Sequence, residues 1–342
     1  MKLKCLLFFV ASAISLHSFA GEYNFDGTDY DRNIKTLDWS EEFDVDGRPN
    51  PEKWDYEVGY VRNKEAQYYT KDDPKNTRVE NGMLVIEAVK DESSPNKITS
   101  ASVITLNKKE FLYGRIEVRA KIPGGRGTWP AIWLLGVNRS KLGWPKCGEI
   151  DIMEEVGFDE DVLTANVHTY GSAKLKTENI KKGWRRKIEN ACADFHVYAL
   201  EWTPQSLKFF IDGKFLGEYP RPKNPDYWHF DKPMYLLMNL AIGGSWGGQQ
   251  GVDDSIFPAK YYIDYVRYYV AADSPRKYVS PYGSDLNDLA AAGKQVMALM
   301  EGIDGIQNVT DGQDAGDAEI NITYMSSGKL AAKIQAEGRT TD

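Results

Sequence analysis

The chain has 342 residues, a formal net charge of −8 and 42% hydrophobic residues. This composition excludes a disordered chain, and the acidic balance argues against a nucleic-acid partner, which calls for a basic patch. The length can bury one large core or two ordinary ones. Phe, Trp and Tyr make up 12% of the residues, which is more than a core alone usually requires.

The first twenty residues have the layout of a secretory signal. Lys2 and Lys4 precede an apolar run over residues 6–16, and Ser18 and Ala20 supply the small residues of a cleavage site. That run is too short to span a bilayer, and no other run approaches the roughly 18 residues that a spanning helix needs. We therefore expect residues 1–20 to be a signal peptide. The mature protein should be secreted or periplasmic and free of the membrane.

Residues 21–270 form the predicted main domain. Short alternating segments are broken by turn residues; in residues 113–122 the alternation predicts one apolar and one charged face. Asp212-Gly213 separates two β-rich segments, 207–211 and 214–219, and predicts a hairpin. No long amphipathic helix interrupts this pattern, so we predict an all-β sandwich or barrel of antiparallel strands.

Composition changes in residues 271–342. All nine tryptophans lie before residue 247. Asp273-Ser274-Pro275 is typical of a linker, and Ser284 could cap a short helix. We assign this region to a linker and a C-terminal tail or small appended unit.

Two cysteines remain after removal of the signal, Cys147 and Cys192. In an oxidising compartment they could form one disulfide, and two buried free thiols are the equal alternative. Geometry decides between the two states, and the sequence does not show it.

The most informative segment is residues 149–154, EIDIME. Acidic and apolar residues alternate at its start, so Glu149 and Asp151 share one face of a predicted strand. Clustered carboxylates repel and raise one another's pKa, so stability does not explain them. Retaining glycoside hydrolysis requires such a set, with one carboxylate as nucleophile and one carboxylic acid as proton donor.

The second glutamate of such a pair is less obvious. In a regular strand Glu155 shares the face of Glu149, but at ~3.3 Å per residue their Cα atoms would lie about 20 Å apart. Glu154 is nearer and has the wrong parity, which a β-bulge between Asp151 and Glu154 would correct. A solvated acidic strand edge is the other interpretation of this segment.

Tryptophans surround this segment. Trp129 and Trp133 lie on one face of a predicted strand, Trp144 precedes the acidic strand, and Trp246 lies in a glycine-rich loop. Aromatic faces with a few polar groups suit a binding cleft, and pyranose rings stack on such faces. A core role is the alternative for Trp133, and the glycine flanks make it a weaker alternative for Trp246.

These motifs together resemble glycoside hydrolase family 16, in its laminarinase-like branch. Residues 149–154 match the E-x-D-x-x-E signature of the family. Residues 39–44, 63–69, 127–133 and 264–267 also resemble family motifs and occur in the same order. The resemblance covers about residues 37–270.

The resemblance implies a concanavalin-like jelly roll, a β-sandwich of two antiparallel sheets with a concave substrate cleft. It implies that Glu149 is the nucleophile, that Glu154 is the acid/base and that Asp151 lies between them. The positions that look like sugar-binding ones are Asn63, Trp129, Trp133, Trp144, Trp246 and His168. For His168 a core role is the alternative.

No cofactor is expected for catalysis, but many members of the family bind a structural calcium ion away from the cleft. The matching positions are Glu42, Gly82 through its carbonyl, and Asp264. Such oxygen ligands suit calcium.

The expected activity is endo-acting hydrolysis of β-1,3-glucan by double displacement. Mixed-linkage β-1,3-1,4-glucan and a galactan such as agarose are the alternative substrates, because loops set specificity within one fold. A non-catalytic β-glucan-binding protein is the alternative of another class, although such a protein would be expected to lose the acids. The expected partner is a polysaccharide, and we expect a monomer.

Overall fold

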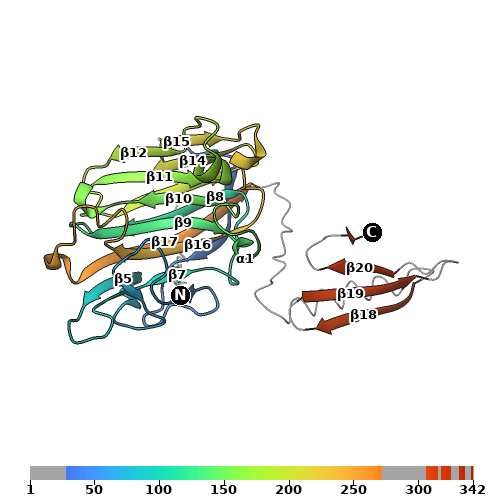
Figure 1. Cartoon of the computed structure of the whole chain (residues 1–342), viewed down its shortest axis with the longest axis horizontal. Helices are drawn as coiled ribbons and strands as arrows, with labels where there is room; N and C mark the ends of the chain where they lie inside the picture. Colours follow the sequence, from blue (N-terminus) through green and yellow to red (C-terminus); the bar gives the residue numbers. More distant parts are fainter. Residues whose placement is uncertain (1–27, 272–305, 315–316, 325–330, 336–339, 342) are drawn as a thin grey trace, which may run out of the picture.

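The computed structural model describes residues 28–271, 306–314, 317–324, 331–335 and 340–341 (Figure 1). The predicted signal peptide, the linker that follows residue 271 and the helix expected at Ser284 lie outside the described residues. No helix in the described part of the chain is long and apolar enough to cross a membrane.

Two sheets form the body of residues 28–271. A ten-stranded sheet, here called the outer sheet, has the order β15-β14-β13-β8-β17-β5-β6-β3, with β1 on β17 and β4 on β5. Its strands are β1 (Ile34–Glu41), β3 (Tyr68–Tyr69), β4 (Thr77–Glu80), β5 (Met83–Lys90), β6 (Ile98–Ser100), β8 (Gly114–Lys121), β13 (His196–Trp202), β14 (Ser206–Ile211), β15 (Lys214–Pro220) and β17 (Ala259–Ala271).

A seven-stranded sheet, here called the cleft sheet, has the order β12-β11-β10-β9-β16-β7-β2 (Figure 1). Its strands are β2 (Asp55–Tyr56), β7 (Ser102–Ile104), β9 (Thr128–Gly136), β10 (Glu149–Glu154), β11 (Val162–His168), β12 (Gly183–Lys187) and β16 (Met234–Ile242). The strand pairs are antiparallel, except for the two-residue parallel pair of β3 with β6. The predicted all-β sandwich is confirmed.

Helical segments in the described part of the chain are short. They are α1 (Arg139–Leu142), η1 (Gly157–Asp159), the π-helical η2 (Gly171–Leu175), η3 (Pro225–Tyr227) and η4 (Asp254–Ile256). The described parts of residues 306–341 pair as a separate antiparallel sheet of β18 (Ile306–Asp314), β19 (Asp317–Tyr324), β20 (Ala331–Gln335) and β21 (Thr340–Thr341).

The predicted hairpin is present. Ile211 pairs with Lys214 across a two-residue turn. Both turn residues, Asp212 at φ 50° and Gly213 at φ 71°, adopt the positive φ angles of a type I′ turn. The turn chemistry therefore fixes the register of β14 and β15.

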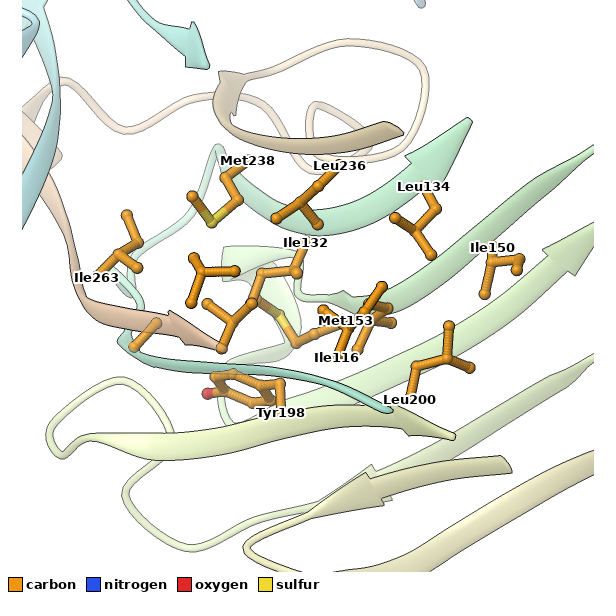
Figure 2. Packing of buried hydrophobic residues seen from close by; sticks show 14 of the residues in the cluster. Ile116, Ile132, Leu134, Ile150, Met153, Tyr198, Leu200, Leu236, Met238 and Ile263 are labelled. Carbon is orange, nitrogen blue, oxygen red and sulfur yellow. The ribbon is translucent and has the colours of Figure 1, made fainter. Parts of the chain in front are cut away.

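The core lies between the two sheets. Figure 2 shows side chains of the cleft sheet, including Ile132, Ile150 and Met153, packed against Ile116 and Tyr198 of the outer sheet. These five side chains are at most 1% exposed. Apolar burial of this extent stabilises the sandwich. Because side chains alternate between the two faces of a strand, it also directs the other face of each strand away from the core.

The charged face of residues 113–122 is covered as well. Arg115 and Glu117, on β8, are only 3% and 2% exposed, although alternation predicts a solvated face. The start of β1 and the segment before it cover them: Arg115 donates to the carbonyl of Ile34, the first residue of β1, at 2.8 Å and stacks on the ring of Tyr30 at 4.3 Å. The alternation of neighbouring residues cannot predict a contact between residues so distant in the sequence.

Candidate active site

Strand β10 carries three carboxylates to one cavity. Against β9, Asp151 pairs with Trp133 and Glu154 pairs with Ala131, so β10 advances three residues where β9 advances two. The extra residue is a β-bulge, and it returns Glu154 to the face of Glu149 and Asp151. All three acids line a cavity of about 480 Å³ on the cleft sheet. The bulge that the spacing required is confirmed.

The side chains on the core-facing side of β10 show the same bulge. Ile152 and Met153 are neighbours, yet both are buried in the core between the sheets, at 2% and 1% exposure. Strict alternation would send one of them to the cleft. The sandwich core therefore holds the bulge in place from below.

Two tryptophan indoles donate hydrogen bonds to the two glutamates. Nε1 of Trp144 donates to Oε2 of Glu149 at 2.9 Å, and Nε1 of Trp129 donates to Oε1 of Glu154 at 3.1 Å. Trp144, on the loop after α1, is 47% exposed, so its ring forms an open wall of the cavity.

His168 faces the acids and does not belong to the core. Its Nε2 lies 3.3 Å from Oδ2 of Asp151 and 3.7 Å from Oε1 of Glu149. Ligand atoms of these three residues lie within 4.8 Å of one another. Carboxylates beside an imidazole occur at metal sites and at acid–base sites, so this geometry alone fits either chemistry.

The pKa values of the three acids are raised because the acids are buried together. Burial and the neighbouring carboxylate of Asp151 raise the pKa of Glu149 to about 7, while His168 opposes the rise. Burial raises the pKa of Asp151 to about 7, against the nearby cation of Lys182. The pKa of Glu154 is raised well above its ordinary value by burial and by both other acids. Of the three acids, Glu154 therefore has the strongest tendency to hold a proton at neutral pH.

The remaining predicted binding residues line the same cavity. Trp133 lies on the floor of the cavity, and the guanidinium of Arg62 lies over its ring, 4.8 Å from the ring centroid. Trp246 packs edge-on against Trp129, with centroids 5.5 Å apart. Asn63 lies beside the loop of Trp246, because its carbonyl accepts a hydrogen bond from the Ser245 amide at 2.8 Å.

Several further polar residues near the acids were missed from the sequence, including Arg139 and Asn166, which also line the cavity. Arg62, Glu65 and Asn239 line the cavity, and Lys182 acts on Asp151 through its charge. Two of them had a signal: Glu65 lies in the motif of residues 63–69, and Asn239 is the only strongly polar residue in the apolar run of residues 234–242. Arg62 and Lys182 depend on loops whose approach to the sheet no local pattern predicts.

The three positions predicted for calcium converge on a surface cavity of the outer sheet. Glu42, Gly82 and Asp264 all line it. In this structure each carboxylate is paired: Arg267 donates to Glu42 at 2.9 and 2.8 Å, and Arg119 donates to Asp264 at 2.5 Å. The oxygen donors fit calcium in kind, although the ion would compete with both arginines.

Cys147 and Cys192 are free thiols. Cys147 is buried beside the cleft sheet, whereas Sγ of Cys192 donates to the buried carboxyl of Glu155 at 3.9 Å. The disulfide alternative is not realised in the structure.

The sequence and the fold match known proteins. The model of the glycosyl hydrolases family 16 matches residues 64–267. A β-glucanase of Rhodothermus marinus is 47% identical over 244 residues, which cover 68% of this chain and 84% of that protein.

Two solved structures carry the same fold. The laminarinase from Rhodothermus marinus superposes with a TM-score of 0.65 at 45% identity, covering 69% of this chain and 97% of that chain. SCLam, a non-specific endo-β-1,3(4)-glucanase, superposes with a TM-score of 0.64 at 40% identity, covering 69% of this chain and 91% of the other. This chain is a glycoside hydrolase with the jelly-roll fold and belongs to the glycosyl hydrolases family 16.

Proposed function

We propose that this protein is a secreted endo-β-1,3-glucanase that hydrolyses laminarin-type glucan with retention of configuration. The observation that carries the proposal is the bulge in β10, which gathers Glu149, Asp151 and Glu154 under a wall of tryptophans. The similarity to a β-glucanase and to a laminarinase supports the choice of glucan.

The first chemical step is assigned to the two glutamates. A carboxylate oxygen of Glu149 attacks the anomeric carbon as the glycosidic bond breaks, and Glu154 gives its proton to the leaving oxygen. The raised pKa of Glu154 supports its role as the acid, and the indole of Trp144 helps to hold Glu149 ionised by donating to it.

The second step reverses the proton transfer. Glu154, now a carboxylate, takes a proton from water while the water oxygen attacks the anomeric carbon and releases Glu149. The negative charge of Asp151 between the glutamates raises the pKa of Glu154 and so helps to return the proton to it. Two inversions give net retention.

Hydrolysis of three polysaccharides tests the substrate. Purified residues 21–342 should release reducing ends from laminarin much faster than from lichenan or agarose. Faster release from lichenan would move the substrate to mixed-linkage glucan, an alternative that the similarity to the non-specific SCLam supports. Release from agarose alone would contradict the glucanase proposal.

Calcium, secretion and the monomeric state belong to the same proposal. Glu42, Asp264 and the carbonyl of Gly82 would hold the ion, which would contribute to stability and not to catalysis, because they lie on the outer sheet. Excess calcium should raise the Tm of chelator-treated protein, and an unchanged Tm would contradict the site.

Export of the full chain from a cell tests the proposed secretion. Light scattering of the purified protein tests the proposed monomeric state.

A further inference from the structure

We infer that Glu65 is a positioning residue that sets the orientation of two sugar-binding side chains, Asn63 and Trp133, through a directional chain of hydrogen bonds. The inference rests on the proposed function, since it concerns how the same cleft binds glucan. Glu65 is 8% exposed and lines the same cavity as the three acids of β10.

Three donors converge on this carboxylate. Nδ2 of Asn63 donates to Oε1 at 3.2 Å, and Nε2 of Gln67 and the hydroxyl of Tyr69 donate to Oε2 at 2.7 and 3.2 Å. A carboxylate only accepts, so each neighbour must turn a donor toward it. Burial raises the pKa of Glu65, and Arg62 and these three donors oppose the rise.

The chain continues to the floor of the cleft. Because the Tyr69 hydroxyl gives its proton to Glu65, it accepts from Nδ2 of Asn239, at 2.9 Å. The amide of Asn239 is then fixed, with Oδ1 toward Nε1 of Trp133, which donates to it at 2.8 Å. An indole can only donate, so the two ends of the chain agree on a single direction.

Residues 63–65 also contact the loop that carries Trp246. The backbone of Glu65 forms an isolated antiparallel β-bridge with Gly243, and the amide of Ser245 donates to the carbonyl of Asn63 at 2.8 Å. At Gly244 a Cβ would lie 3.0 Å from Cγ of Glu65, and its φ of 78° is one that other residues rarely adopt. A side chain at Gly244 would therefore need both a strained backbone and a shift of Glu65 or of the Asn63 backbone.

Glu65→Gln breaks the direction of the chain with little change in shape. The amide has one oxygen for the three donors, so its NH₂ must face either the NH₂ of Asn63 or the donors of Gln67 and Tyr69. Asn63 restores the contact only by turning over, which exchanges the donor and the acceptor that it presents to the cleft. Tyr69→Phe cuts the chain on the other side and releases the amide of Asn239.

The first experiment measures kinetics on laminarin. We expect Glu65→Gln and Tyr69→Phe each to raise KM about 10-fold with kcat within about 3-fold, the effect of losing a hydrogen bond to a charged or buried group. The double variant should raise KM by less than the product of the two single effects, because the two residues belong to one hydrogen-bonded network. Lowered kcat and Tm with unchanged KM would indicate a merely structural role and overturn the inference.

Two matched variants serve as controls. Glu218→Gln changes an exposed carboxylate on β15 of the outer sheet. Tyr198→Phe removes a buried hydroxyl that has no hydrogen-bond partner among the described residues. Neither should change KM.

The second experiment does not depend on the substrate. The indole N–H resonance of Trp133, assigned by its loss in Trp133→Phe, should move in Glu65→Gln and Tyr69→Phe and stay in place in both controls. An unmoved resonance would overturn the inference even if laminarin is the substrate. If the wild-type protein is inactive on laminarin and both variants still move the Trp133 resonance, the proposed function is rejected and the inference is kept.

Discussion

The outer sheet and the cleft sheet both bury carboxylates, but they surround them differently. On the outer sheet, Arg115 donates to Glu117 at 2.7 Å and lies 3.5 Å from Glu201. On the cleft sheet, Glu149 and Asp151 have an imidazole and an indole beside them, and no arginine of the described residues forms an ion pair with either.

The difference separates two uses of a buried charge. A buried ion pair satisfies its members and loses most of its chemical reactivity, because its charge is already neutralised. Acids held together without a matched cation raise one another's pKa into the range where protons move at neutral pH. The predictions below test this contrast, from the largest expected effect to the smallest.

The largest effect is expected at the cleft. Glu149→Gln or Glu154→Gln should lower kcat on laminarin by about 10³-fold or more, since each removes a reacting group, and should leave laminarin binding in place. Turnover is measured by reducing-end release and binding by calorimetry. A variant that keeps a tenth of wild-type kcat would remove that residue from the mechanism.

The outer sheet should respond in stability. Arg115→Met leaves Glu117 and Glu201 buried without their cation and should lower the free energy of unfolding by about 3–5 kcal/mol. Chemical denaturation measures the loss, and kcat of the folded fraction should be unchanged. Replacing all three residues by apolar ones should recover most of the stability, whereas a further loss would contradict the account.

Glu155 tests the limits of this contrast, because it is buried, forms no ion pair with a cation of the described residues and does not line the cleft. Burial and the acids Glu160 and Asp161 raise its pKa from 4.5 to about 9. The folded state keeps this proton while the unfolded state releases it, so stability falls as pH rises from about 4.5 to about 9.

Glu155→Gln removes that titration. The variant should gain stability over the wild type as pH rises, on the order of 1–3 kcal/mol at pH 7, with unchanged kcat. Thermal unfolding between pH 5 and pH 9 compares the two proteins. Parallel curves for both would show that Glu155 is ionised in the folded state.

Asp151→Asn should shift the pH profile of activity. Glu149 must be ionised to attack, and the charge of Asp151 contributes to raising its pKa to about 7. Removing that charge lowers the pKa of Glu149, so the acid limb of kcat/KM should move to lower pH. The three acids titrate together, so the limb reports the cluster rather than one residue. An unmoved limb would mean that Asp151 carries no charge in the free enzyme.

Local patterns predicted the parts of the fold that local chemistry decides. Asp212-Gly213 marked its hairpin, and the parity of Glu154 required the bulge that β10 contains. Contacts between distant segments were not predictable in this way. The burial of Arg115 depends on the start of β1 and the segment before it, and the orientation of Trp133 depends on Glu65, which lies 68 residues earlier in the chain.

The stereochemistry of the first product tests the central claim most directly. Proton NMR during the first minutes of laminarin hydrolysis distinguishes the anomers of the new reducing end before they equilibrate. Double displacement by Glu149 and Glu154 predicts that the β-anomer appears first. Initial release of the α-anomer would mean a single inverting step and would contradict the roles assigned to the two glutamates.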